Sequence, residues 1–289
     1  MFLLKERYAF PKGDIMKKGI IIASFGTTHE EARKRCIESI EKKVRKEYEN
    51  FLVLRSFTSQ IIIDKLRKEN YSVDNLVEAL EKMKDKKIYD VYIQPLYILP
   101  GKEYRRIIGQ VNEFSKRNYP INIRIGRPLL SYDIDYDKIV EGLNLPRLED
   151  AESFLLMGHG SDFFTDRAYK ILEKRFKEKG YPNIFIGTLK GVNTIGHIIP
   201  ILKSQKIRKV KLMPFMLVAG RHAVNDMVAG ENSWKRKLLA ADIQVEVSMK
   251  GLGEIESIQD IYMSHLKDIL LTEKEEVQLN LGGITCSVL

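Results

Sequence analysis

The stretch Gly19–Thr27 reads GIIIASFGT, an apolar run that ends in small residues and a phenylalanine. A similar run, FLLMGHGS, occupies Phe154–Ser161 and aligns Gly26 with Gly160. Short, continuously apolar runs are typical of parallel strands that are buried on both faces of a sheet. We therefore interpret the two stretches as the first strands of two related α/β units.

Two further landmarks repeat in the same order along the chain. The sequence IQPLYILPG at Ile93–Gly101 matches LMPFMLVAG at Leu212–Gly220 without a gap, so that the prolines and the final glycines align. Between these pairs, Asn50–Val53 resembles Asn183–Ile186. Three landmarks repeated in one order predict two copies of one α/β domain.

Apolar runs alternate with amphipathic stretches throughout the chain, which favours βαβ units around mainly parallel sheets. The predicted strands are Gly19–Ser24, Phe51–Ser56, Val91–Leu96, Ile121–Ile125, Ser153–Met157, Ile184–Gly187, Val210–Pro214 and Ile243–Val247. The predicted helices are Glu30–Tyr48, Val73–Lys84, Glu103–Lys116, Phe163–Lys179, Ile195–Lys203, Asn232–Ala240 and Glu254–Leu270. Ser72 is the expected N-cap of the second helix. The predicted fold class is α/β, with two similar domains and a cleft between them.

The boundary between the two copies is expected near Leu143–Glu152, where Pro146 and several polar residues interrupt the pattern. The last predicted helix follows the second copy and is expected to pack back on the first domain. The predicted units are an N-terminal tail of residues 1–16, α/β domains of residues 17–145 and 146–253, a C-terminal helix of residues 254–271 and a tail of residues 272–289.

The composition is that of a folded, basic protein. Of the 289 residues, 44% are hydrophobic and 30% are charged, which is enough for a packed core. The chain has 48 Lys and Arg against 39 Asp and Glu, a formal charge of +9, which favours an anionic partner. Two cysteines exclude a disulfide scaffold and a zinc site built from cysteines alone.

Several partner classes lack any motif in the sequence. No apolar run approaches the roughly 18–20 residues of a membrane span and no secretory leader is recognisable, so we expect a cytoplasmic protein without a membrane partner. No Walker A sequence and no glycine-rich dinucleotide motif occurs, which predicts no nucleotide. The basic residues come without a zinc finger or an RNA-binding aromatic motif, so nucleic acid is not expected. The sequence leaves a homo-oligomer possible.

Ligands of open parallel sheets bind outside the carboxyl ends of the strands, so the loops there are the candidate site. His159 stands between Gly158 and Gly160, where the backbone can approach a ligand closely and leave the imidazole uncovered. Lys190 follows the next strand of the same copy and is expected near His159. A tight turn and a solvated lysine are the structural alternatives.

The repeat also pairs two residues after the third strand of each copy. His222 stands two residues after Gly220, and Glu103 stands two residues after Gly101. Glu103 and His222 therefore occupy equivalent points that can face each other across the cleft. The structural alternative for Glu103 is that it only favours the positive end of its helix.

Two imidazoles and a carboxylate suit a borderline divalent metal such as Co²⁺, Fe²⁺, Ni²⁺ or Zn²⁺, and three ligands leave a position open for a substrate. The same groups can accept protons. The other histidines, His29, His197 and His265, are expected to be structural or solvated, and Cys36 is expected in the core.

Longer motifs at these positions resemble the anaerobic sirohydrochlorin cobaltochelatases, a branch of the class II chelatases. The resemblance spans about Lys17–Leu270. It is carried by ASFGTT at 23–28, QPL at 94–96, PGKEY at 100–104, MGHG at 157–160, AGRHAVNDM at 219–227 and SWK at 233–235. It implies a chelatase-like fold of two α/β domains with the site between them. It also implies ATP-independent insertion of Co²⁺ into sirohydrochlorin, a tetrapyrrole with several carboxylates, on the way to cobalamin.

The resemblance also implies roles for single residues. His159 matches a metal ligand and proton acceptor, His222 matches the second metal-binding histidine, and Glu103 matches an acidic residue of the cleft. The chain departs from the family at Lys190, where a glutamate usually serves as a third ligand, and at Arg221, which replaces an acidic residue.

Both departures add positive charge where the carboxylates of the macrocycle would lie, so Lys190 and Arg221 are predicted to bind the substrate. Two alternatives stay open. One is a chelatase for iron and another tetrapyrrole, because the sequence cannot separate metals that all accept imidazole ligands. The other is a tetrapyrrole-binding or carrier protein that uses a chelatase scaffold without catalysis, and its main support is Lys190, since an ammonium beside a divalent cation is repulsive.

Overall fold

The computed structural model describes residues 18–117, 121–148, 151–160, 163–221, 223–271, 277–281 and 284–288. The predicted N-terminal tail, residues 1–16, lies outside the described residues. Among the described residues, no helix is long and apolar enough to cross a membrane.

Two parallel sheets of four strands each organise the described part of the chain. The first has the order β2-β1-β3-β4 and consists of β1 (Lys18–Ser24), β2 (Leu52–Phe57), β3 (Asp90–Pro95) and β4 (Asn122–Ile125). The second has the order β6-β5-β7-β8 and consists of β5 (Glu152–Gly158), β6 (Ile184–Thr188), β7 (Lys209–Pro214) and β8 (Gln244–Val247). All eight predicted strands are confirmed, each with bounds within one residue of the prediction.

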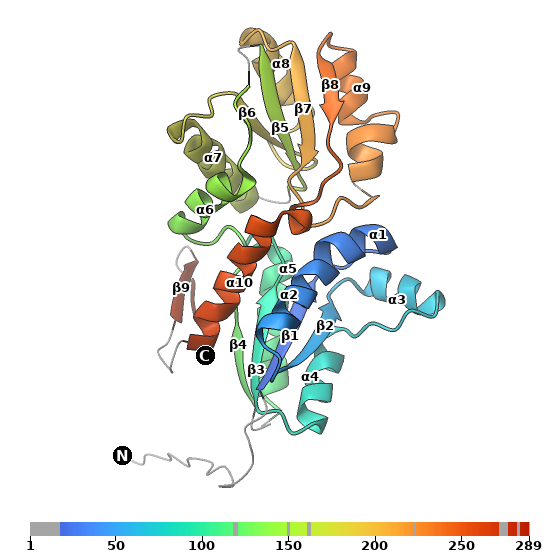
Figure 1. The fold of residues 1–289 in the computed structure, drawn as a ribbon, viewed down its shortest axis with the longest axis vertical. Helices are drawn as coiled ribbons and strands as arrows, with labels where there is room; N and C mark the ends of the chain where they lie inside the picture. The colour runs from blue at the N-terminus through green and yellow to red at the C-terminus, as the bar shows by residue number, and fades with distance from the viewer. Residues whose placement is uncertain are drawn as a thin grey trace.

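The two sheets lie in separate halves of the molecule (Figure 1). We call β1–β4 with their helices the N-terminal half, and β5–β8 with theirs the C-terminal half. Within the region predicted as a C-terminal tail, β9 (Val277–Leu281) and β10 (Ile284–Val288) form an antiparallel pair. The domain bounds drawn from the sequence stay a prediction.

The register of the strands reproduces the internal repeat. Ala23 pairs with Pro95 in the first sheet, and Met157 pairs with Pro214 in the second. The glycines that follow β1 and β5, Gly26 and Gly160, both have a left-handed backbone, with φ of 89° and 70°. The two glycines that align in sequence therefore have the same backbone geometry in the two halves.

The second strands of the two copies align differently from the sequence prediction. Ile20 pairs with Val53, and its counterpart Phe154 pairs with Ile184. Val53 therefore corresponds to Ile184, two residues before the Ile186 that the sequence match suggested. A shift by two residues keeps each side chain on the same face of a strand, which is why the apolar pattern did not reveal it.

Helices cover the sheets of both halves. Those of the N-terminal half are α1 (Glu30–Arg33), the π-helical η1 (Lys34–Glu38), α2 (Ser39–Glu47), α3 (Gln60–Lys68), α4 (Leu76–Asp85) and α5 (Lys102–Ser115). Those of the C-terminal half are α7 (Phe163–Glu178), α8 (Ile195–Ser204), the π-helical η2 (Ala223–Ala229), α9 (Trp234–Leu239) and the 3₁₀ turn η3 (Leu252–Glu254). The last helix, α10 (Glu256–Leu271), follows the second sheet. The helix α6 (Asp133–Leu143) follows the first sheet and packs against α7 and α10 (Figure 1). The helices α3 and α6 were not predicted.

The predicted N-cap of α4 was wrong by three residues. Asn75 is the cap: its side chain accepts a hydrogen bond from the Glu78 backbone, and the Glu78 carboxylate accepts one from the Asn75 backbone. Ser72 cannot start the helix because Asp74 is still extended, with its carbonyl accepting from Phe57 N at 2.9 Å. Because Asp74 is paired with β2, the helix begins only after it, at the capping box formed by Asn75 and Glu78.

One apolar cluster runs through both halves of the molecule. It includes Ile22 from β1, Leu156 from β5 and Tyr262 from α10, each fully buried. Two other clusters cover the opposite faces of the sheets, one under α4 and α5 and the other under α8 and α9. The shared cluster fixes how the two sheets stand relative to each other, because separating them would expose it to water.

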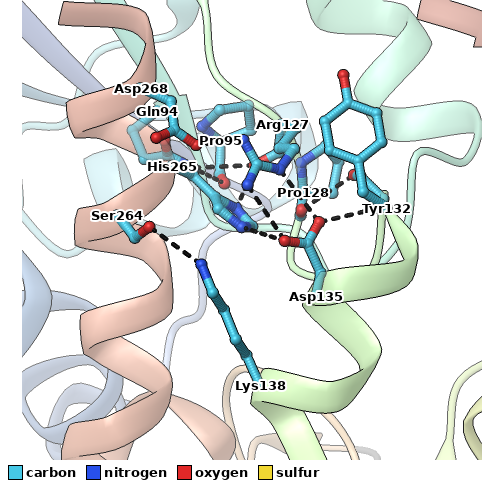
Figure 2. A network of polar contacts seen from close by, with 11 residues as sticks. Gln94, Pro95, Arg127, Pro128, Tyr132, Asp135, Lys138, Ser264, His265 and Asp268 are labelled. Atoms are coloured by element: carbon cyan, nitrogen blue, oxygen red, sulfur yellow. Dashed lines mark hydrogen bonds and ion pairs between the residues drawn. The ribbon is translucent and has the colours of Figure 1, made fainter. Parts of the chain in front are cut away.

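A buried polar network fastens α10 to the N-terminal half (Figure 2). The two ring nitrogens of His265 lie 3.2 Å from the carbonyl oxygen of Arg127 and 3.0 Å from the carboxylate of Asp135. The guanidinium of Arg127 donates to the same carboxylate at 3.1 and 3.2 Å, and His265 and Asp135 are completely buried. Both oxygens facing His265 are acceptors, so the ring is oriented by an acceptor at each of its nitrogens.

The electrostatics of Asp135 follow from these contacts. Burial by itself raises the pKa of the Asp135 carboxyl, but hydrogen bonds and charge from His265 and Arg127 outweigh it and hold this pKa well below its usual range. The carboxylate is therefore ionised in the folded chain. Its unfolded pKa is about 3.9, so its contribution to stability is present above that value and is lost as the pH falls through the lower folded pKa.

We predict that Asp135→Asn lowers the free energy of unfolding by about 3–5 kcal/mol near pH 7, because it leaves the Arg127 guanidinium and the buried ring of His265 without their carboxylate. The difference from the unmodified chain should shrink as the pH falls below about 4, where the carboxylate of the unfolded chain is protonated. Denaturant unfolding at several pH values measures it. The matched control is Asp268→Asn, which touches the same guanidinium but is half exposed, and it should cost under about 1 kcal/mol. Equal losses in the two variants would contradict the prediction.

Candidate functional site

The loops after the strands of the two halves meet at the junction between the sheets. A Cβ placed on Gly220, which follows β7, would lie 3.5 Å from the hydroxyl oxygen of Thr27, which follows β1. Beside this contact is a cavity of about 370 Å³, lined by His29–Ala32 and Arg35 from the N-terminal half and by Ala219, Val224 and Met249 from the C-terminal half. The carboxyl edges of the two sheets therefore face one another, as the parallel topology requires of a shared ligand site.

His159 is exposed on the loop after β5, and close packing explains the glycines on either side of it. A Cβ on Gly158 would lie 2.7 Å from the ring of Tyr169. A Cβ on Gly160 would overlap the carbonyl oxygen of Lys190, and the positive φ of this glycine already disfavours other residues. The two glycines let neighbouring chain segments come close and leave the imidazole at the surface.

The protonation of the His159 ring is set by its neighbour. Nδ1 lies 2.8 Å from the carbonyl oxygen of Gly160, an acceptor, so Nδ1 carries the proton. The lone pair of the neutral ring is then on Nε2. This arrangement suits both a metal ligand and a proton acceptor, because an oriented N–H on one ring nitrogen raises the basicity of the other.

The backbone of Lys190, in the loop after β6, lies beside the backbone of His159, in the loop after β5. Its N–H donates to the carbonyl of His159 at 3.1 Å, one step beyond the bond from Leu189 N to Gly158 O. The side chain of Lys190 is exposed. The structure thus brings Lys190 and His159 together at one strand end, where a long flexible ammonium can reach an anion bound over the loop.

Glu103 lies in the first turn of α5, at the carboxyl edge of the first sheet. Its Oε2 is buried without a hydrogen-bond partner among the described residues. Burial raises the pKa of the nearby Tyr97, and the charge of Glu103 raises it further; the Tyr97 hydroxyl lies 2.5 Å from the hydroxyl of Thr58. A buried carboxylate oxygen without a partner is costly, so Glu103 is suited to receive a proton or a cation.

Arg221 is exposed and follows Gly220 at the contact between the two halves. His222, the other predicted metal ligand, lies outside the described residues. In the part of the chain that the structure describes, no group of three His, Cys, Asp or Glu side chains can hold a metal ion. His159, Glu103 and Arg221 thus each follow a strand at one of the two edges that face one another. That their side chains form one site stays a prediction.

The remaining histidines differ in their surroundings. His29 is the N-cap residue of α1 and lines the cavity at the junction, while His197 is exposed and its Nδ1 lies 3.1 Å from the hydroxyl of Thr194. His265 belongs to the buried network with Asp135. Cys36 is in the core as expected, where burial raises the pKa of its thiol to about 12.

A larger cavity of about 540 Å³ opens beside the candidate site in the C-terminal half. It is lined by Thr188 and Leu189 after β6, by Thr194–Gly196 at the start of α8, and by residues of η2 and α9 that include Asp226 and Lys237. This cavity adjoins the loop that carries Lys190. The sequence reasoning missed it, together with the pair of Tyr97 and Thr58.

Comparisons with known proteins bear on the whole of this architecture. The model of a family described as cobalt chelatase (CbiK) matches residues 18–271. A sirohydrochlorin cobaltochelatase of Salmonella typhimurium is 32% identical over 265 residues, which are 90% of this chain and 99% of the relative. A sirohydrochlorin cobaltochelatase of Nitratidesulfovibrio vulgaris is 31% identical over 86% of this chain and 89% of its own. The fold also resembles a solved structure of SirB from Bacillus subtilis with Fe³⁺, with a TM-score of 0.65, 14% identity and coverage of 89% and 96%.

We predict that Gly160→Ala displaces the loop of Lys190 and lowers the free energy of unfolding by roughly 1–3 kcal/mol, because the new Cβ meets a carbonyl oxygen and the backbone stays left-handed. Thermal unfolding measures the loss. Gly109→Ala is the control: it lies within α5, its Cβ would meet nothing within 4 Å, and it should be neutral or stabilising. A Gly160→Ala protein as stable as the control would contradict this account of the loop.

Proposed function

The chain belongs to the cobalt chelatase (CbiK) family, and from that premise we propose that it inserts Co²⁺ into sirohydrochlorin without ATP, as a step of cobalamin biosynthesis. The observation that carries the proposal is the position of His159. Its imidazole is exposed at the edge where the two sheets face one another, with Nδ1 held by the Gly160 carbonyl.

Metal insertion sets two chemical requirements. Two pyrrole N–H protons must leave the macrocycle, and the metal must exchange its waters for the ring nitrogens. The Nε2 lone pair of His159 can take a pyrrole proton or hold the metal beside the ring. The metal is a substrate here, so weak and exchangeable ligands serve the reaction better than a closed, tightly binding site.

His222 and Glu103 complete the proposed set. His222 would present the metal to one face of the ring, and Glu103 would assist from the N-terminal half. The Oε2 of Glu103, buried and without a partner among the described residues, supports this role, since a proton leaving the macrocycle would satisfy it. The sequence repeat aligns Glu103 with His222, which supports a common place for the two at the facing edges.

Lys190 and Arg221 are proposed to bind the carboxylates of the tetrapyrrole. Both are exposed, and both stand on loops of the C-terminal half beside the proposed metal ligands. Arg221 can hold a carboxylate through two parallel hydrogen bonds, whereas Lys190 acts as a mobile point charge. Imidazole ligands also accept Fe²⁺, Ni²⁺ and Zn²⁺, and the commitment to Co²⁺ rests on the family.

A second candidate, a tetrapyrrole carrier without catalysis, is favoured by the position of Lys190. The backbone of Lys190 bonds to that of His159, and an ammonium within reach of His159 would repel a divalent cation and attract the carboxylates of the macrocycle. A carrier would bind sirohydrochlorin and leave Co²⁺ uninserted. An anaerobic steady-state assay with sirohydrochlorin and Co²⁺ separates the two, because only the chelatase forms the cobalt complex faster than the reaction without protein.

We predict that His159→Ala and His222→Ala each lower the rate of Co²⁺ insertion by at least about 100-fold and leave the melting temperature nearly unchanged. His159 is exposed, so its truncation leaves no cavity in the core, and the sequence predicts the same for His222. The assay follows the absorbance of the cobalt complex under anaerobic conditions. His197→Ala, at an exposed histidine outside the proposed set, should keep normal turnover. Near-normal turnover of either of the first two variants would remove that residue from the proposed site.

We predict that Lys190→Glu tightens binding of Co²⁺ to the protein alone by roughly 30–1,000-fold, because it removes a cation and adds an anionic ligand. Calorimetric titration with Co²⁺ and then with sirohydrochlorin measures both affinities. If Lys190 serves only the substrate, the variant should weaken tetrapyrrole binding and leave the Co²⁺ affinity unchanged. Unchanged affinities for both ligands would show that Lys190 is a solvated bystander.

A further inference from the structure

The strand-end loop of the N-terminal half displays an aromatic ring at the junction. Phe25 is 48% exposed, although a phenylalanine gains most from burial. The loop also reaches the other half, because Thr27, two residues on, lies beside Gly220 and the motif of Arg221. Single exposed apolar residues are common on protein surfaces, so it is the place of Phe25, at the edge that faces the other half, that makes its ring available to a ligand bound there.

The loop holds this ring outward and cannot turn it into the core. The backbone on either side is fixed by bonds from Thr58 N to Ser24 O at 2.9 Å and from Ser59 N to Phe25 O at 3.3 Å. The space beneath the loop is filled by Phe57, which is fully buried and lies 2.5 Å from where a Cβ on Gly26 would stand. The exposure of Phe25 is therefore a fixed feature of the fold.

The internal repeat shows what this position corresponds to in the other half. The C-terminal half has the same two backbone hydrogen bonds, both of 3.1 Å. Leu189 N donates to Gly158 O as Thr58 N does to Ser24 O, and Lys190 N donates to His159 O as Ser59 N does to Phe25 O. The glycine that follows is left-handed in both loops. Phe25 thus stands on the backbone of the N-terminal half where His159 stands in the C-terminal half.

We propose that Phe25 packs against the face of the tetrapyrrole opposite to His159, so that the macrocycle lies between an apolar ring of one half and the imidazole of the other. The proposal rests on the proposed function and names the contact that holds the flat, conjugated part of the substrate. Cationic side chains can bind the carboxylates at the rim of the macrocycle, but its flat face needs an apolar side chain to pack against. Val224 and Met249, also partly exposed, continue the apolar surface along the junction.

The test is an anaerobic fluorescence titration of metal-free sirohydrochlorin onto the full chain and its variants. Phe25→Ala should weaken binding about 5–30-fold, Phe25→Leu should lie between, and Phe25→Trp should stay within about threefold of the unmodified protein, because an aromatic ring restores the contact. The control is Leu239→Ala on α9, where the side chain is 49% exposed, and it should bind normally. The ratio between Phe25→Ala and the unmodified protein should not change with salt, since the contact is apolar.

Calorimetry with Co²⁺ alone completes the test. All Phe25 variants should bind the metal like the unmodified protein, because the ring contacts the macrocycle only. Normal tetrapyrrole binding by Phe25→Ala would overturn the inference, and so would a loss of Co²⁺ affinity in Phe25→Ala or in Phe25→Leu. An unmodified protein that does not bind sirohydrochlorin would instead refute the proposed function, so the two failures are distinguishable.

Discussion

The ionised carboxylate of Asp135 joins the helices α6 and α10 and, together with the apolar cluster shared by both halves, holds the two sheets in their arrangement. Burying this charge is costly, and the cost is offset because Arg127, His265 and the Tyr132 backbone all donate to it. His265 belongs to α10, which follows the second sheet and returns to the first, where its Tyr262 also donates to the carbonyl of Tyr97 at 3.1 Å. The network thus holds the chain where the carboxyl edges of the two sheets face each other.

The facing edges share one backbone and differ in side chains. Phe25 and Ser59 of the N-terminal half correspond to His159 and Lys190 of the C-terminal half. An apolar ring thus stands on one edge where an imidazole stands on the other. In the proposed function, this asymmetry would give the two faces of a flat substrate different surroundings, as insertion of a metal from one side requires.

The sequence was informative wherever burial imposes a pattern. All eight strands were predicted because strands buried on both faces are continuously apolar, and Lys190 was placed beside His159 by the rule for strand ends. The helices α3 and α6 were missed because their first turns lack a helical spacing: α3, QIIIDKLRK, opens on a continuous apolar run, and α6, DIDYDKIVEGL, alternates acidic and apolar residues as a strand does. The pairing of His265 with Asp135 could not be predicted, since 130 residues separate them and no local pattern marks a contact made by packing.

The repeat contained more information than the residue types alone suggested. Aligning Gly26 with Gly160 already sets Phe25 against His159, but a phenylalanine after an apolar strand is ordinarily taken as core. Only the exposure and the hydrogen bonds of the loop show that the same backbone presents both side chains outward. The duplicated loop thus keeps one backbone, while the side chain at this position is a phenylalanine in one half and a histidine in the other. In the proposed function, that change separates the residue proposed to hold the macrocycle from the residue proposed to act on its nitrogens.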